Sequence, residues 1–260
     1  MKDKIVLTSN MTNFVSMVEA LINKPERMDR MGLSYGKYGL GKTTTLEWYY
    51  TNNLCYRVRA MAACSRSVDM MVEDLLGCYR VASKGRLKQD IRELVYIARK
   101  QQLPLFIDEA DRVVRTSILI ETVRDIHDLA KIPIILIGQE NIINLLQRED
   151  LAHIFSRITG VVEYKELSAQ DIQRISRELC DLECEPKVAI FIRNVTLGDF
   201  RLVNAVLSKA ENFCAFNKVT NISMAIAKEA SMALPHPDDL NRIIEMEEKV
   251  SSREPVAAMG

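Results

Sequence analysis

The chain has 260 residues, with 35 basic and 35 acidic side chains and therefore a formal net charge of zero. A hydrophobic content of 48% and a charged content of 27% are ordinary for a globular protein, which excludes a disordered chain and a polycation. The longest apolar run, 132–137, is too short to span a bilayer, and the six cysteines show no paired framework. We therefore expect a cytoplasmic protein with reduced thiols and no membrane contact.

Helical and strand patterns alternate along the first 166 residues. The first half carries a helix at about 14–22, a strand at 31–35, a helix at 44–50, a strand at 55–60 and helices at about 67–82 and 86–101. The second half carries a strand at 103–107, a helix near 117–130, a strand at 132–137, a helix at 140–148 and a strand at 161–164. This alternation is typical of an α/β protein whose parallel sheet is sandwiched by helices.

From Ser168 onward the pattern changes to helices alone. Ser168 and Asp171 form a start that resembles a capping box, and further helices fit roughly 186–194, 199–216 and 222–233. The sequence thus predicts an α/β core with a short N-terminal helix over 1–166, a small all-helical lid over 167–234 and a partly disordered C-terminal tail over 235–260.

A phosphate-binding motif stands between the strand at 31–35 and the helix after it. Its residues, which fit G-x-x-x-x-G-K-[ST], are Gly36, Lys37, Tyr38, Gly39, Leu40, Gly41, Lys42 and Thr43. The glycines let successive N–H groups curl around one anion, and the following helix, which Thr44 enters, adds the positive end of its dipole. Lys42 is expected to reach the β- and γ-phosphates, and Thr43 to ligate Mg²⁺. The motif predicts a site for ATP and magnesium.

Two adjacent carboxylates, Asp108 and Glu109, follow the buried strand at 103–107. In this arrangement the first holds Mg²⁺ through water, and the second orients and deprotonates the attacking water. The plain alternative is an acidic helix N-terminus. A separation of about 65 residues from Lys42 fits a P-loop sheet in which one strand lies between the two motif-bearing strands. The pair favours ATP hydrolysis over a kinase reaction, which seldom needs the second carboxylate.

Four blocks of sequence together resemble the AAA+ ATPases, and among them the transposition regulators typified by the phage Mu B protein and by TnsC. These blocks are Gly36–Thr43, Leu105–Arg112, Ile134–Gly138 and Gly198–Arg201, and the resemblance extends over about residues 10–233. It implies a homo-oligomer, a hexameric ring or a helical filament, that coats double-stranded DNA when ATP is bound, delivers this DNA to a transposase and activates that enzyme. It also implies a bacterial or phage-encoded protein associated with the nucleoid.

The resemblance implies roles for three further residues. Gln139, or its rival Asn141, would be the polar sensor that holds the lytic water. Arg157 would be the arginine finger that reaches the γ-phosphate of a neighbouring subunit, and Arg201 would be a second sensor within its own subunit. A guanidinium suits both tasks because it is always charged and can bind two oxygens. Each arginine has the alternative of an ordinary surface charge.

A basic region at 78–102 carries seven cations against two acids, a net charge of +5 in a neutral chain. Within it, Lys84 and Arg86 lie on a loop between two helices, and the resemblance implies that this loop lines the central channel of a helical oligomer, where DNA would bind. Contacts of this kind would bind the DNA backbone without reading bases. The alternative is a solvated helix face.

Two other functions remain open from the sequence. One is a helicase loader, or the ATPase that helps an insertion-sequence transposase. The other, of a different class, is a signalling ATPase that changes conformation and binds no DNA.

Overall fold

Five parallel strands form the central sheet, in the order β2-β3-β4-β1-β5. The strands are β1 (Met31–Tyr35), β2 (Tyr56–Arg59), β3 (Leu105–Asp108), β4 (Ile134–Gly138) and β5 (Ile158–Glu163). The computed structural model describes residues 4–62, 67–232 and 234, so the predicted tail at 235–260 lies outside the described residues. Because β4 separates β1 from β3, the prediction of a strand inserted between the two motif-bearing strands is confirmed.

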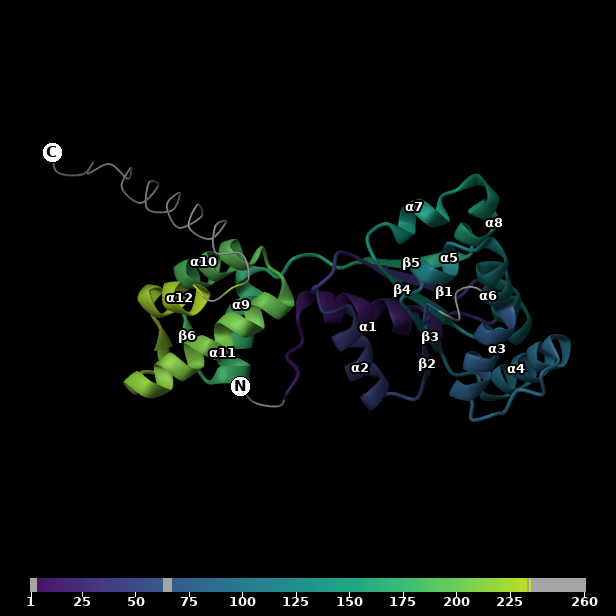
Figure 1. Cartoon of the computed structure of the whole chain (residues 1–260), viewed down its shortest axis with the longest axis horizontal. Coiled ribbons are helices and arrows are strands. Elements are labelled where there is room, and N and C mark those ends of the chain that lie inside the picture. Colours follow the sequence, from purple (N-terminus) through teal and green to yellow (C-terminus); the bar gives the residue numbers. More distant parts are fainter. Residues whose placement is uncertain (1–3, 63–66, 233, 235–260) are drawn as a thin grey trace. The chain divides into compact units, whose positions relative to one another are not determined.

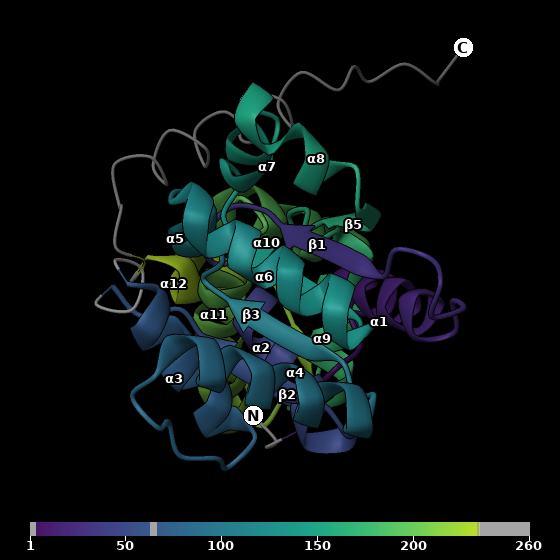
Figure 2. The ribbon, with the colours of Figure 1, turned by 90° about the vertical axis from the view of Figure 1, so that its right-hand side faces the viewer.

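The sheet belongs to a unit that comprises Ser9–Lys165, called here the sheet unit. Helices cover both of its faces (Figure 1). One face carries α1 (Ser9–Ile22) and α2 (Lys42–Asn52), and the other carries α3 (Val68–Cys78), α4 (Leu87–Gln101) and α6 (Ser117–Ala130). Figure 2 shows α3, α4 and α6 on their shared side of the sheet.

The alternation of side chains along the inner strands explains the two layers. On β3, Phe106 packs against Phe14 of α1 and Tyr49 of α2. Leu105 and Ile107 belong to the apolar core on the other face, under α3, α4 and α6. All three strand residues are at most 2% exposed. Full burial of one such side chain stabilises the fold by about 1.5–3 kcal/mol, so a strand that is apolar on both sides is stable only between two helical layers.

The loops of the sheet unit contain short helices that the periodicity did not predict. They are α5 (Asp111–Val114), a 3-10 turn (Glu149–Leu151) and α8 (Ala152–Phe155), while α7 (Ile142–Leu146) forms the middle of the helix expected at 140–148. Helix α3 ends at Cys78, short of the predicted residue 82, and Arg80 then turns the chain with a positive φ of 58°. A single turn is too short to show a helical repeat, which is why these elements were missed.

The second unit, called the helical unit, comprises residues 4–8, 166–232 and 234 of the described part of the chain. Its elements are α9 (Ala169–Cys180), α10 (Pro186–Thr196), α11 (Phe200–Asn217), α12 (Met224–Ser231) and a parallel ladder of two-residue strands, β6 (Glu183–Cys184) and β7 (Asn221–Ile222). The capping box of Ser168 and Asp171 is present. Residues 4–8 lie in this unit rather than in the core, because Val6 joins its apolar cluster and Lys4 pairs with Glu178 at 3.1 Å.

Within the described ranges, no helix combines the length and the apolar character that crossing a bilayer requires.

Candidate functional site

Three of the predicted site residues directly follow the ends of neighbouring strands. Gly36 follows β1, Glu109 follows β3, and Gln139 follows β4, the strand between them. Since the strands are parallel and hydrogen-bonded to one another, these three turns meet at one edge of the sheet. Ligands bind at the carboxyl edge of open α/β sheets, so the structure brings the two nucleotide motifs into one place.

The phosphate-binding loop depends on glycine at positions where the backbone could not hold another residue. Gly39 and Gly41 have positive φ angles of 80° and 87°, and Gly41 is the N-cap of α2. At Gly36, with φ of 155°, a Cβ atom would lie 2.7 Å from the carbonyl oxygen of Tyr164. The loop therefore combines left-handed backbone, which favours glycine, with a close approach of Gly36 to the end of β5 that leaves no room for a Cβ atom.

Lys42 lies at the centre of this loop. Its Nζ donates to the carbonyl oxygens of Gly36 and Lys37, at 2.7 and 2.6 Å, and the residue is only 8% exposed. Leu40 is buried and anchors the loop, whereas Tyr38 is 71% exposed. The lysine ammonium is therefore held over the loop at the N-terminus of α2, where its charge and the helix dipole act on the same anion.

Thr43 and Asp108 form an oxygen pair suited to magnesium. The Thr43 hydroxyl donates to Oδ2 of Asp108 at 3.4 Å, which joins the first turn of α2 to the end of β3. Burial raises the pKa of Asp108, the backbone N–H of Glu109 opposes this, and the charge of Glu109 raises the pKa further. A bound dication would relieve that charge, and hydroxyl and carboxylate oxygens are the ligands that Mg²⁺ takes. The residues present fit the metal.

Two arginines hold the carboxylate of Glu109. Its Oε1 lies 3.4 Å from Nη2 of Arg59, and its Oε2 lies 3.9 Å from Nη2 of Arg112. Arg112 is itself fixed by donation from Nη1 to the carbonyl oxygen of Ala60 at 3.0 Å, and Glu109 has a positive φ of 57°. The sequence motifs do not single out Arg59 or Arg112. The available signals were the position of Arg59 at the end of β2, beside β3, and the three-residue spacing from Glu109 to Arg112.

The turn after β4 favours Gln139 over Asn141 as the polar group at this edge. The backbone N–H of Gln139 donates to Oδ1 of the buried Asp111 at 3.2 Å. Its side-chain Oε1 is buried and has no hydrogen-bond partner among the residues that the structure describes, whereas Asn141 is exposed. A buried polar atom without a partner is costly unless another group satisfies it, so this amide is free to bind a ligand or a water.

Arg157 lies in the turn between α8 and β5, where it pairs with Asp128 of α6. Nε lies 3.1 Å from Oδ1 and 3.0 Å from Oδ2 of the carboxylate, and Nη2 lies 2.9 Å from Oδ2. The neighbouring His127 is 2% exposed, and its Nδ1 lies 3.0 Å from Oδ1 of Asp128. Within a single chain the guanidinium is thus bound to a carboxylate rather than to the phosphate-binding loop.

Arg201 lies in the first turn of α11, in the helical unit. Asp199 caps this helix by accepting from the backbone N–H groups of Arg201 and Leu202, at 2.8 and 3.1 Å. Gly198 precedes the cap with a positive φ of 66°, and a Cβ there would lie 2.8 Å from the backbone nitrogen of Leu167. The Gly198–Arg201 block is therefore a capped turn fixed by backbone contacts, and the side chain of Arg201 is exposed.

The loop that carries Lys84 and Arg86 is organised by one buried carboxylate. Asp90 accepts from the Ser83 hydroxyl at 2.7 Å and from the backbone N–H groups of Lys84 and Arg86 at 2.9 and 3.3 Å. The ammonium of Lys84 pairs with Glu93 at 3.2 Å. The side chain of Arg86 is exposed and has no hydrogen bond or ion pair within the described part of the chain. The two predicted DNA contacts therefore differ in how much of their charge is compensated.

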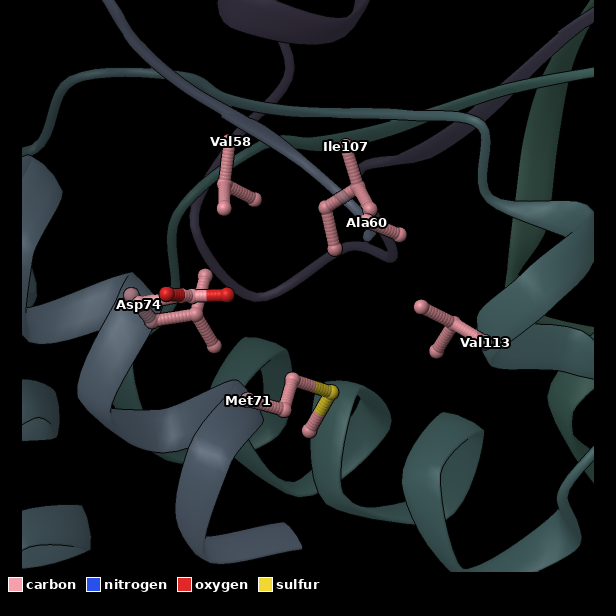
Figure 3. Close-up of a pocket in the computed structure, with 7 residues that line it drawn as sticks. Val58, Ala60, Met71, Asp74, Ile107 and Val113 are labelled. Atoms are coloured by element: carbon pink, nitrogen blue, oxygen red, sulfur yellow. The ribbon is translucent and has the colours of Figure 1, made fainter. Parts of the chain in front are cut away.

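A small pocket lies between the sheet and the helices α3 and α5 (Figure 3). Val58 of β2, Ile107 of β3 and Ala60, which follows β2, line it on the sheet side; Met71, Asp74 and Leu75 line it from α3, and Val113 from α5. Asp74 is its one charged lining residue. The pocket shares no residue with the phosphate-binding loop, and its one link to the contacts described above is Ala60, whose carbonyl oxygen accepts from Arg112.

Comparison with known proteins agrees with this geometry. Residues 26–146 match the family model described as "AAA domain". No curated protein matches the chain in sequence. Three similar solved structures are the ORC2 protein of Aeropyrum pernix in its ADPNP–ADP complexes, the ORC1 protein of the same organism in complex with DNA, and the RuvB Holliday junction branch migration motor of Thermotoga maritima.

These structures resemble the chain in fold rather than in sequence. The ORC2 protein has a TM-score of 0.68 at 11% identity, with 90% of this chain and 70% of that chain covered. The ORC1 protein has a TM-score of 0.57 at 13% identity, with 98% of this chain and 80% of that chain covered. RuvB has a TM-score of 0.55 at 18% identity, with 96% of this chain and 79% of that chain covered. The chain therefore has the AAA+ P-loop fold, and residues 26–146 are the part that matches the AAA domain model.

Proposed function

We propose that this protein hydrolyses ATP, binds duplex DNA without sequence preference as an ATP-dependent homo-oligomer, and delivers that DNA to a transposase, which it activates. The observation that carries the ATP part is the meeting of Lys42, Thr43, Asp108 and Glu109 at one edge of the sheet. The transposition part rests on the four sequence blocks that resemble Mu B and TnsC.

In this proposal the phosphates of ATP lie in the loop Gly36–Thr43, and Lys42 exchanges its carbonyl partners for the β- and γ-phosphates. Thr43 and Asp108 would hold Mg²⁺, which would supply positive charge beside the phosphates. Glu109 orients and deprotonates the attacking water, and the free amide of Gln139 positions the same water.

Arginine residues would complete the site from two sides. Arg157 would act on the γ-phosphate of a neighbouring subunit, and Arg201 on the phosphate in its own subunit. Arginine fingers contribute about 10³–10⁵ to the rate in related P-loop enzymes. Turnover should then rise with protein concentration. Mixing Arg157→Ala with Lys42→Ala protein should restore activity, since one supplies a working loop and the other a working finger. If mixing restores nothing, Arg157 does not act in trans.

DNA binding is supported by the basic region around Lys84 and Arg86, and by the similar fold of one protein solved in complex with DNA and of a branch migration motor. A single subunit offers few phosphate contacts, whereas an oligomer would place many copies along one duplex, where they act together.

Electron microscopy of the protein with ATP and duplex DNA tests this proposal. Filaments or rings that require both ligands, and that capture a transposase added in trans, would support it. Rings that load a helicase instead would favour the helicase-loader function. No assembly on DNA in ATP would overturn the proposal and favour a DNA-independent switch.

A further inference from the structure

The outward face of α4 carries a stripe of cations. Lys88, Arg92, Tyr96, Arg99 and Lys100 are all exposed, Tyr96 at 65%. Their spacing, four residues between the first three and then three or four, places them on one side of an α-helix. The opposite side, with Leu94 and Ala98, is buried in the core. We call these five residues the α4 stripe.

The cations of the stripe are not compensated by acids. None of the four has a side-chain hydrogen bond or an ion pair with any residue that the structure describes. The two acids of the helix are used elsewhere, since Asp90 is buried against the Ser83–Arg86 loop and Glu93 pairs with Lys84. The stripe therefore presents four positive charges that have no internal partner.

Helix stability does not account for this arrangement. Arg99 and Lys100 lie in the last turn, where the helix dipole favours cations. Lys88 lies in the first turn, where the dipole disfavours them, and Lys88 and Arg92 are like charges at a four-residue spacing, which destabilises a helix by about 0.2–0.5 kcal/mol. A solvated helix of this kind usually carries acids at such positions. The charge pattern instead complements a polyanion.

We propose that the α4 stripe binds the sugar–phosphate backbone of duplex DNA, and that it is the larger part of the DNA contact of which the Lys84–Arg86 loop is one end. From Lys88 to Arg99 the helix rises about 16 Å, a length over which one strand of a duplex presents about five phosphates. The hydroxyl of Tyr96 supplies a neutral donor of the kind that also binds phosphate.

The stripe suits nucleic acid better than an acidic peptide. Apart from the ring of Tyr96 its five side chains offer no apolar anchor, and protein interfaces depend on buried apolar or aromatic anchors. Contacts to phosphate position a duplex without reading its sequence. The inference rests on the proposed DNA-binding function and changes where that function is located.

Fluorescence anisotropy with two labelled duplexes of unrelated sequence, in ATP and across a salt series, tests the stripe. Four double variants of the full chain are compared with wild type: Arg92→Gln with Arg99→Gln, Arg92→Lys with Arg99→Lys, Lys84→Gln with Arg86→Gln, and, as a control of equal charge, Arg27→Gln with Arg115→Gln. Binding of a fluorescent ATP analogue shows that each variant keeps its nucleotide site.

The glutamine variant of the stripe should bind both duplexes at least about tenfold more weakly at 0.1 M salt, and the slope of log K against log salt should fall by about 1.8 for two lost contacts. The lysine variant should keep the wild-type slope, and the Arg27/Arg115 control should keep the wild-type affinity and the wild-type slope. An unchanged slope in the glutamine variant, with binding lost in Lys84→Gln/Arg86→Gln, would overturn the stripe but leave DNA binding intact. No binding by wild type at about 50 mM salt would overturn both proposals.

Discussion

Arg157 and Asp128 form a two-pronged ion pair within one chain, with three nitrogen–oxygen distances between 2.9 and 3.1 Å. Burial raises the pKa of Asp128, but hydrogen bonds from Arg157 and His127 outweigh it, so the pKa of this carboxyl lies below its usual value. The pair is therefore formed throughout the neutral range. If Arg157 acts as the proposed arginine finger, it has to leave Asp128 before it can reach a neighbouring subunit.

Asp128→Asn should release Arg157 and so favour the active assembly. Both side chains are more than a quarter exposed, and an exposed pair contributes about 0.2–1 kcal/mol. The protein concentration that gives half-maximal ATP turnover should therefore fall by up to about fivefold. Asp125→Asn, which removes an acid paired with Arg124 on the same helix, is the control. A drop in turnover at every protein concentration would show that Asp128 positions the arginine rather than restrains it.

Lys42→Ala and Glu109→Gln should separate nucleotide binding from hydrolysis. Lys42 supplies the main cation of the phosphate-binding loop, so its loss should weaken ATP binding at least about tenfold. Glu109→Gln keeps that cation and removes the proposed general base, so ATP should still bind while turnover falls at least about a hundredfold. Nucleotide titration and phosphate release measure the two steps. An equal loss of ATP affinity in both variants would remove Glu109 from the role of base.

His127 should make the fold less stable in mild acid. Burial lowers its pKa, although Asp128 opposes the shift. In the folded state the imidazole of His127 therefore stays neutral just below pH 6.5, where the same group takes up a proton in the unfolded state. The free energy of unfolding falls as the pH drops below that value. Denaturant unfolding at about pH 7.5 and 5.5 should show this loss, and His127→Gln should reduce it. The exposed His153, changed to Gln, is the matched control. A loss of equal size in all three proteins would exclude His127 as its source.

Gly36→Ala should damage the fold more than Gly85→Ala. Both glycines have positive φ, but a Cβ at Gly36 meets backbone 2.7 Å away, whereas at Gly85 nothing lies within 4 Å. We expect a loss of about 2 kcal/mol or more at Gly36, together with weakened ATP binding, and about 1 kcal/mol at Gly85. Thermal unfolding with and without nucleotide compares them. Equal losses would mean that the end of β5 moves to accept the methyl group.

Sequence patterns predicted the sheet, its covering helices and the order of the motif-bearing strands, because apolar periodicity and the glycine-rich motif are local signals. They did not predict the pairing of Arg157 with Asp128, which are 29 positions apart and meet only through the packing of α6 beside the turn before β5. The ion pairs that hold Glu109 were missed for the same reason, since Arg59 at the end of β2 contacts Glu109 at the end of the neighbouring strand β3. The basic region was visible in sequence, but only the folded helix shows that Lys84 is paired and the α4 stripe is not.

The most direct test measures duplex DNA binding by wild type, Lys42→Ala and Glu109→Gln, each with ATP, with ADP and without nucleotide. If ATP drives assembly on DNA, wild type and Glu109→Gln should bind in ATP, the latter for longer because it cannot hydrolyse the nucleotide, and Lys42→Ala should not. Equal binding by all three proteins, or binding by wild type that does not depend on the nucleotide, would contradict an ATP-gated DNA-binding protein.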